Sequence, residues 1–370
     1  MSIAAGLVGL PNVGKSTLFN ALTRSSIPAE NYPFCTIDPH KACTLVIDPR
    51  IEKLQKIFGS KKTMPAYTQF VDIAGLVRGA AEGAGLGNQF LAHIREVNVI
   101  LHVLRAFEDQ NITHTEDKVD PIADYETIMV ELGLKDLESI DKRLQKIEQL
   151  SKSNKSNPQQ TKALTEEKTL LEQVKSAIDQ QQIEQAAELI SKSAIETVPL
   201  LCAKKSLIIA NIGEEEISGD TYANNPHYKS LVAKFGIARV IPICAKFEYE
   251  LAQLSDEERT TLKAELGITH TGLEKIIEKT YETLGLITFF TCGPQEIHAW
   301  PVSKGITIRQ AAGEIHSDLE RGFICADVYN TADLFPLGNT NTLKDLGKIR
   351  TEGQAYIVQD GDIVLVKFNV

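Results

Sequence analysis

The stretch Gly9-Leu-Pro-Asn-Val-Gly-Lys-Ser-Thr17 decides the fold of this chain. Its spacing is G-x-x-x-x-G-K-S, and it follows an apolar run, Ile3–Val8, and precedes a segment expected to be helical. Gly9 and Gly14 let the backbone curl so that several N–H groups point at one phosphate. The helix that begins here adds the positive end of its dipole. The spacing therefore predicts a P-loop that binds a nucleotide triphosphate.

Side chains of the same loop supply charge and a metal ligand. Lys15 is expected to reach the β- and γ-phosphates and to act in catalysis, and Ser16 is expected to hold Mg²⁺. The predicted nucleotide contacts within the loop are Asn12, Val13, Gly14, Lys15, Ser16 and Thr17.

Two later segments have the features of a γ-phosphate sensor and a second magnesium ligand. Thr36 lies in Asn-Tyr-Pro-Phe-Cys-Thr-Ile-Asp-Pro, about twenty residues after the P-loop, where a first switch is expected. Asp72-Ile-Ala-Gly75 follows an apolar stretch and reads D-x-x-G. Asp72 is predicted to contact Mg²⁺ through water, and the Gly75 amide is predicted to read the γ-phosphate during catalysis.

The residue after this motif is unusual for a GTPase. Many GTPases place a Gln there to orient the attacking water, but this chain has Leu76, whose side chain cannot do so. The following run, Arg78–Gly87, is rich in glycine and is interpreted as a second switch.

The base-recognition signal also departs from the guanine pattern N-K-x-D. After the apolar run Leu207–Ala210 the chain has Asn211-Ile-Gly-Glu214, so the Lys is absent and the carboxylate is one methylene longer. After the next run, Cys244-Ala-Lys246 stands where a second base-contacting loop is expected. The sequence therefore favours ATP over GTP, because a displaced carboxylate would leave guanine donors poorly paired.

Short apolar runs set the fold class. Ile3–Val8, Val99–Leu104, Leu207–Ala210 and Val240–Cys244 are typical of buried parallel strands, and helical stretches between them indicate an α/β sheet covered on both faces. The interval between the second and third runs is too long for a simple crossover. It contains two apolar stripes at helical spacing, separated by the polar stretch Ser151–Gln160, and so predicts an inserted antiparallel helical hairpin. The stripe residues are Leu137, Ile140, Leu144 and Ile147, then Leu164, Leu171, Val174 and Ile178.

The pattern changes from about Leu284 to strands and turns. Five strands are expected at Ile287–Thr291, Ala299–Val302, Phe323–Tyr329, Tyr356–Val358 and Ile363–Phe368. Asp360-Gly-Asp362 is read as a hairpin turn, and Thr307–His316 as a helix, which together predict a small α+β domain. The expected domains are a nucleotide-binding domain over 1–127 and 198–282, the hairpin over 128–197 and the C-terminal domain over 283–370.

The composition narrows the possible partners. The formal net charge of -10 argues against a general nucleic-acid coat, so DNA is not an expected partner and any RNA contact must use a local basic patch. The six cysteines have no C-x-x-C spacing and are interpreted as free thiols in a reducing compartment, the cytoplasm. No apolar run has the length of a membrane span.

Taken together, these motifs resemble the Obg-like ATPase (YchF) family over nearly the whole chain. The pieces are GLPNVGKST, NYPFCTIDP, DIAGLVRGAAEGAGLGNQF, the N-x-x-E in place of N-K-x-D, QAAGEIHSDLERGF and DGDIVLVKFNV. The last two resemble a TGS domain, a β-grasp module. The resemblance implies a Mg²⁺-dependent ATPase with a P-loop GTPase core, an inserted helical hairpin and a TGS domain, associated with ribosomes.

The resemblance also implies roles for individual residues. Phe107 is expected to stack on the base, with Asn211 and Ile212 beside it, and Cys244, Ala245 and Lys246 complete the expected base contacts. His114 is expected to substitute for the missing Gln. Asn12 stands where related GTPases use an Asn near a monovalent cation, so K⁺ is a further candidate cofactor. The run Gly213-Glu-Glu-Glu216 departs from a regular base motif.

Two classes of function remain open from the sequence. The first is an enzyme that hydrolyses ATP, and the second is a GTP-binding switch or an RNA- or ribosome-binding adaptor with incidental hydrolysis. Ribosome or ribosomal RNA binding would need a basic patch on the hairpin or on the C-terminal domain. The candidate residues are Lys142, Arg143 and Lys146, with Arg309, Lys344, Lys348 and Arg350.

Overall fold

The computed structural model describes residues 4–25, 40–73, 92–109, 118–153 and 158–369. These residues form two compact units. Of the described residues, the first unit contains those up to 25, residues 40–42 and those between 70 and 273, and the second contains residues 43–69 and 274–369.

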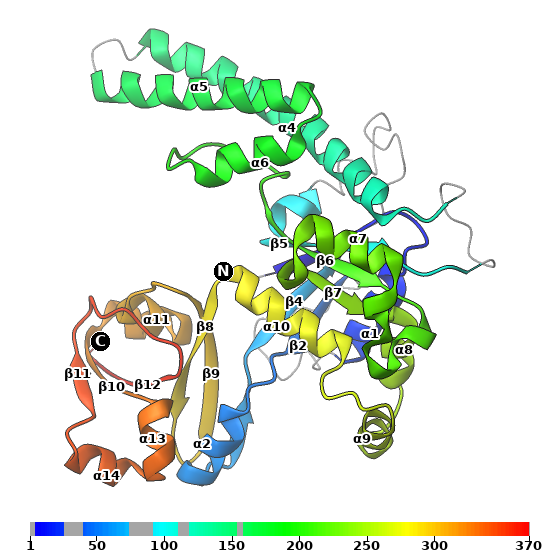
Figure 1. Ribbon diagram of the computed structural model, residues 1–370. Helices are drawn as coiled ribbons and strands as arrows, with labels where there is room; N and C mark the ends of the chain where they lie inside the picture. The colour runs from blue at the N-terminus through cyan, green and yellow to red at the C-terminus, as the bar shows by residue number, and fades with distance from the viewer. Residues whose placement is uncertain (1–3, 26–39, 74–91, 110–117, 154–157, 370) are drawn as a thin grey trace. The chain divides into compact units, whose positions relative to one another are not determined.

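The first unit is organised on a six-stranded sheet in the order β2-β4-β1-β5-β6-β7 (Figure 1). The four strands β1 (Ala4–Val8), β5 (Val99–Arg105), β6 (Lys205–Asn211) and β7 (Val240–Ile243) pair in parallel. The other two are β2 (Lys41–Leu45) and β4 (Tyr67–Asp72). Every residue of β1 and β5 is buried, as expected for a sheet covered on both faces. The predicted α/β fold class is confirmed.

Helices follow the parallel strands of this unit. The helix α1 (Lys15–Arg24) begins directly after the P-loop and buries Leu18 and Leu22. Further α-helices of this unit are α7 (Pro226–Phe235), α8 (Ala245–Leu251) and α9 (Asp256–Glu265), and α10 (Gly272–Leu284) begins at its end and continues into the second unit. Short 3-10 turns are η2 (Glu214–Glu216), η3 (Ser218–Asn224) and η4 (Ile237–Arg239).

The predicted hairpin consists of α4 (Pro121–Ser153) and α5 (Pro158–Asp179), which run side by side in Figure 1. Ile140 and Ile147 of α4, and Leu171 and Val174 of α5, are at most 1% exposed, so the two apolar stripes do face buried surface. A third helix, α6 (Ile183–Lys192), packs against both and was not predicted. The helix α4 begins seven residues before the predicted start of the insertion at residue 128 and therefore extends into the predicted core range.

The second unit is built on a mixed six-stranded sheet in the order β11-β10-β12-β8-β9-β3. Its strands are β3 (Lys62–Met64), β8 (Leu286–Cys292), β9 (Glu296–Ser303), β10 (Phe323–Asn330), β11 (Arg350–Glu352) and β12 (Asp362–Phe368). Its helices are α2 (Arg50–Phe58), α11 (Ile308–Ile315), α12 (Ser317–Arg321), α13 (Thr331–Leu337) and α14 (Thr340–Asp345). Two buried clusters, one containing Phe290 and Leu334 and the other Phe289 and Val328, form its core.

The segment around Tyr356 corrects one prediction. Tyr356–Val358 is not a strand, although Ile357 makes an isolated bridge to Thr307. The backbone instead pairs with the residues before α11, and the Tyr356 hydroxyl donates to Asp362 at 2.9 Å. Because no strand precedes it, the Asp360–Asp362 turn does not close a hairpin, and its Gly361, at φ 82°, leads directly into β12.

The second unit also includes residues 43–69, which were expected in the nucleotide-binding domain, so β2 and β4 each pass from one unit to the other along the chain. The physical reason is that β3 pairs in parallel with β9, and Ile51 and Leu54 of α2 are buried in the cluster that contains Phe290. None of the described helices is long and apolar enough to cross a membrane.

Candidate nucleotide-binding site

The P-loop has the conformation that its glycines were expected to allow. Gly14 has φ 100° and Asn12 has φ 61°, both in the left-handed region. A Cβ atom on Gly9 would lie 2.4 Å from the Val103 carbonyl oxygen, and one on Gly14 would lie 2.3 Å from the Asn211 amide nitrogen. The loop therefore needs glycine for close approach at both positions and, at Gly14, also for its backbone angle.

The Lys15 side chain is buried within the P-loop. Its Nζ donates a hydrogen bond to the Leu10 carbonyl oxygen at 2.6 Å. Burial lowers the pKa of Lys15 to about 8, and the negative charge of Asp72 opposes that shift. An ammonium group held in this way is ready to exchange the carbonyl for phosphate oxygens, which are much stronger partners.

The two described residues predicted to serve Mg²⁺ have suitable chemistry. Ser16 is exposed at the first turn of α1, and Asp72 ends β4. Burial raises the pKa of Asp72, while the charges of Lys15 and His40 lower it. A hydroxyl and a carboxylate are oxygen ligands that Mg²⁺ prefers, and a partly buried carboxylate favours a nearby cation. Within the described ranges, no group of three or more His, Cys, Asp or Glu side chains could hold a metal.

A cavity of about 500 Å³ lies beside the P-loop. It is lined by residues from the loop, the end of β5 and the segments after β6 and β7, which meet because parallel strands end at one edge of the sheet. The predicted contact residues that line it are Asn12, Gly14, Thr17, Phe107, Asn211, Ile212, Cys244, Ala245 and Lys246. The structure thus brings together residues that lie more than two hundred positions apart in the chain.

Asn211 connects the two loops of this cavity. It is 5% exposed, its Nδ2 donates to the Val13 carbonyl at 2.9 Å, and its Oδ1 accepts from the Ala245 amide at 2.9 Å. Both ends of the side-chain amide are therefore engaged by the protein. Asn211 holds the P-loop against the loop after β7, and a base amine would more readily meet a backbone carbonyl than this side chain.

Glu214, the displaced carboxylate of the base motif, pairs with Lys246. Its Oε2 lies 2.7 Å from the Lys246 Nζ, and both residues line the cavity. The neighbouring Glu216 accepts from the Gly213 amide at 3.0 Å and from the Asn225 side chain. The acidic run is thus divided between an ion pair at the cavity and a cap of the η2 turn.

Phe107 rests on a side chain that the sequence analysis missed. The Arg105 guanidinium lies over the Phe107 ring with its Cζ 4.7 Å from the ring centroid, and its Nε donates to the Phe107 carbonyl at 3.2 Å. Arg105 is 2% exposed and also donates to the Asp109 carbonyl. The sequence did carry one signal for this role, since Arg105 is a charged residue at the end of a strand that is apolar apart from His102. Through its hydrogen bonds, Arg105 fixes the backbone that presents Phe107 to the cavity.

Three predicted site residues, Thr36, Gly75 and His114, lie outside the described residues. The proposed second switch, Arg78–Gly87, does so as well. Of the cysteines, Cys43, Cys202, Cys244, Cys292 and Cys325 are free thiols.

The phosphate loop, the buried lysine and the adjoining cavity on a parallel sheet define a P-loop nucleotide-binding protein of the GTPase structural class. Two family models match the chain: "50S ribosome-binding GTPase" over residues 4–135, and YchF-GTPase_C, described as "Protein of unknown function (DUF933)", over residues 286–369. The solved structure of the Schizosaccharomyces pombe YchF GTPase is similar, with a TM-score of 0.83 and 36% identity, covering 99% of this chain and 98% of that one.

Curated relatives match over the same extent. The chain is 44% identical to the "Ribosome-binding ATPase YchF" of Bacillus subtilis (strain 168), with 100% of both chains covered. It is 45% identical to the "Obg-like ATPase 1" of Oryza sativa subsp. japonica, covering 99% of this chain and 92% of the relative. The chain therefore belongs to the family of YchF and Obg-like ATPases.

Proposed function

We propose that this chain is a Mg²⁺-dependent ATPase that prefers ATP to GTP and acts as a ribosome-associated nucleotide switch. The observation that carries the base preference is the ion pair between Glu214 and Lys246 at the cavity. A guanine reader needs a carboxylate free to accept from the ring N–H and the amino group. Here the carboxylate already has a cationic partner, so guanine would leave donors poorly paired on desolvation.

Adenine avoids that cost because its ring N1 is an acceptor. Its exocyclic amine can donate to a backbone carbonyl of the cavity, since the Asn211 amide is engaged at both ends. Phe107 can stack on either purine and so contributes affinity without selecting the base.

Hydrolysis in this proposal depends on positioning and charge. Lys15 would bind the β- and γ-phosphates, the P-loop amides would surround them, and Ser16, Thr36 and Asp72 would hold Mg²⁺, Asp72 through water. When bound, Mg²⁺ offsets the negative charge of the phosphate oxygens. Gly75 senses the γ-phosphate, and His114 orients the attacking water in place of the missing Gln. K⁺ beside Asn12 would add positive charge near the same phosphates.

Ribosome association in this proposal draws on the names of the relatives and of the matching family model. The side chains offered for it are the exposed Lys142 and Lys146 on α4 and, in the C-terminal domain, Arg309, Lys344, Lys348 and Arg350. Of these, Lys348 pairs with Asp333 and Arg350 with Glu352. Arg143 is withdrawn from that set, because its Nε and Nη2 atoms donate to the Glu167 carboxylate at 2.8 and 2.7 Å. The alternative function, a GTP-binding switch with incidental hydrolysis, would require Glu214 to leave Lys246.

Calorimetric titration of the nucleotide-free protein with ATP and with GTP tests the base preference. Each donor left unsatisfied costs roughly 1–3 kcal/mol, so ATP is expected to bind about 5- to 150-fold more tightly than GTP. The double variant Ile212→Lys with Glu214→Asp restores N-K-x-D and should narrow or reverse that ratio. Equal affinity of the wild-type chain for both nucleotides would make the protein a GTPase-like switch with an irregular base motif.

A further inference from the structure

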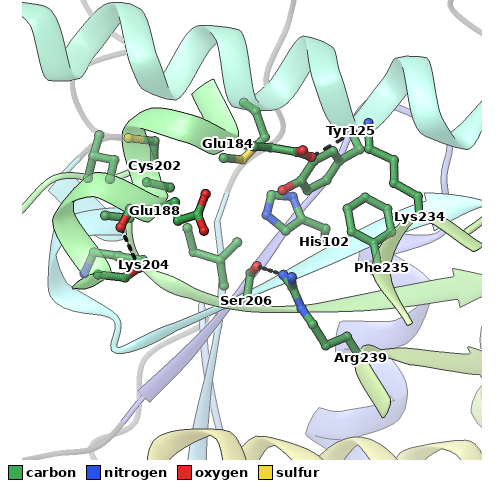
Figure 2. Close-up of a pocket in the computed structure, with 16 residues that line it drawn as sticks. His102, Tyr125, Glu184, Glu188, Cys202, Lys204, Ser206, Lys234, Phe235 and Arg239 are labelled. Atoms are coloured by element: carbon green, nitrogen blue, oxygen red, sulfur yellow. Dashed lines mark hydrogen bonds and ion pairs between the residues drawn. The ribbon is translucent and has the colours of Figure 1, made fainter. Parts of the chain in front are cut away.

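A second cavity, of about 290 Å³, lies in the first unit where the helical insertion meets the sheet. Its walls come from β5 and β6, from α4 and α6, and from the end of α7 and the η4 turn. Figure 2 shows His102 in the middle of the labelled side chains, with Glu184 and Glu188 on the α6 side and Ser206 and Arg239 on the sheet side. None of the residues of the nucleotide cavity lines it.

His102 is the polar group that makes this cavity unusual. It is 1% exposed in the middle of an apolar strand, and its Nδ1 has no hydrogen-bond partner among the described residues. Burial, with the nearby charge of Arg239, lowers the pKa of His102 to about 3, so the imidazole is neutral. The unpaired Nδ1 is enclosed by protein atoms, while the His102 residue as a whole forms part of the cavity wall.

Further donors line the same space, Ser206 and Arg239 from the sheet side and Tyr125 from α4. The Arg239 Nη2 donates to the Ser206 hydroxyl at 2.9 Å, and no carboxylate pairs with Arg239 in the described part of the chain. Tyr125 lies edge-on to His102 with ring centroids 4.9 Å apart. Burial raises the pKa of Tyr125 to about 12, so its phenol remains a donor. Guanidinium, hydroxyl and phenol groups together are suited to a carboxylate.

The opposite wall carries negative charge. Glu184 and Glu188 come from successive turns of α6, both are exposed, and each pairs with a lysine among the described residues. Glu184 lies 3.8 Å from Lys234, which itself binds Glu126 more closely at 2.6 Å, and Glu188 binds Lys192 on its own helix. Two carboxylates on this wall would repel a dianion such as a phosphate, but they would attract an ammonium group.

The remaining walls are apolar, with Ile100, Met129 and Leu201 among them. We propose that this cavity binds a free α-amino acid with an aliphatic side chain, its carboxylate at Arg239, Ser206 and Tyr125 and its ammonium group at Glu188 and Glu184. The aliphatic side chain lies against Met129 and Leu201, and the His102 ring forms part of the cavity wall. The proposal does not depend on ATP hydrolysis or on the base preference.

Binding is tested with the full chain in the absence of nucleotide. The aliphatic L-amino acids are screened by ligand-observed NMR, and the affinity of each binder is measured by calorimetry. With L-leucine as the probe, the two half-ligands 4-methylpentanoate and isopentylamine each lack one charge and should bind at least about tenfold more weakly.

Variants locate the site. Arg239→Gln and Glu188→Gln should each lower the affinity for the amino acid by about tenfold or more, because each removes one charged partner. The matched controls Arg259→Gln on α9 and Glu172→Gln on α5 should leave it unchanged. Ala187→Phe, which fills the cavity from α6, should abolish binding while ATP affinity confirms that the chain is folded.

Three results would overturn the proposal. One is the absence of binding by every aliphatic amino acid. Another is equal affinity for L-leucine and 4-methylpentanoate, which would define a simple anion site. The third is binding that survives Arg239→Gln, Glu188→Gln and Ala187→Phe, which would locate the amino acid elsewhere on the protein.

Discussion

At the scale of single residues, the environment of Lys15 bears on its proposed role in binding the nucleotide phosphates. Burial in the P-loop keeps the ammonium close to the Leu10 carbonyl and makes its charge easier to lose than in water. Phosphates favour the charged form of Lys15. In the proposed complex Lys15 therefore keeps a proton that the free protein releases as the pH rises through about 8.

The affinity for ATP should therefore depend on pH in a definite direction. It is expected to be constant below about pH 7.5 and to fall about tenfold for each pH unit above the Lys15 pKa of about 8. Calorimetric titrations across that range measure it, and in two buffers of different ionisation enthalpy they should also detect proton uptake. Constant affinity to pH 9.5 would show that Lys15 is not the titrating group.

Substitution of the loop side chains gives a more direct test. Lys15→Ala should lower ATP affinity at pH 7 by about 100-fold or more, because a charge-assisted contact to two phosphates is lost. Ser16→Ala should remove the magnesium dependence of binding and turnover. Leu18 and Leu22 of α1 are not altered, so circular dichroism should report an unchanged fold. Wild-type binding by both variants would refute the assignment of the site.

At the scale of elements, a buried ion pair joins the two helices of the insertion. Glu167 of α5 is 4% exposed. Its carboxylate accepts hydrogen bonds from Nε and Nη2 of Arg143 on α4 and from the Thr197 hydroxyl at 3.0 Å. The hydrogen bonds of Arg143 hold the pKa of the Glu167 carboxyl below its usual range. This arrangement assigns Arg143 to the structure of the hairpin.

Glu167→Gln should accordingly lower the free energy of unfolding by about 1–3 kcal/mol, because Arg143 would keep its charge but lose its anion. Urea denaturation followed by circular dichroism measures the change. Glu166→Gln is the matched control: Glu166 is 53% exposed and lies 3.9 Å from Lys162, so the expected change is within about 0.5 kcal/mol. Equal effects of the two substitutions would show that the ion pair does not stabilise the hairpin.

At the scale of the whole molecule, the net charge of -10 means that any electrostatic contact with the ribosome must be made by a local basic patch. Charge reversal at Lys142 and Lys146 should weaken co-sedimentation with ribosomes and reduce its dependence on salt, because fewer counterions would be released. Reversal of Lys192 on α6, whose partner is Glu188, is the control. Co-sedimentation insensitive to both salt and these reversals would argue against an electrostatic contact through α4.

Much of the fold could be read from local patterns. The strands β1, β5, β6 and β7 coincide with apolar runs, and the P-loop is a contiguous motif whose chemistry requires each glycine and the lysine. The stripes on α4 and α5 predicted their pairing, because helical spacing places such residues on one face. These features were predictable because each depends on residues that are neighbours in the chain.

Other features were decided only by tertiary structure. The pairing of Glu214 with Lys246, the support of Phe107 by Arg105 and the engagement of both ends of Asn211 depend on which loops the parallel sheet brings to one edge. The assignment of residues 43–69 to the second unit likewise follows from the pairing of β3 with β9. Side-chain partners from distant segments leave no periodic trace in the sequence, because each is selected by the three-dimensional geometry of the folded chain.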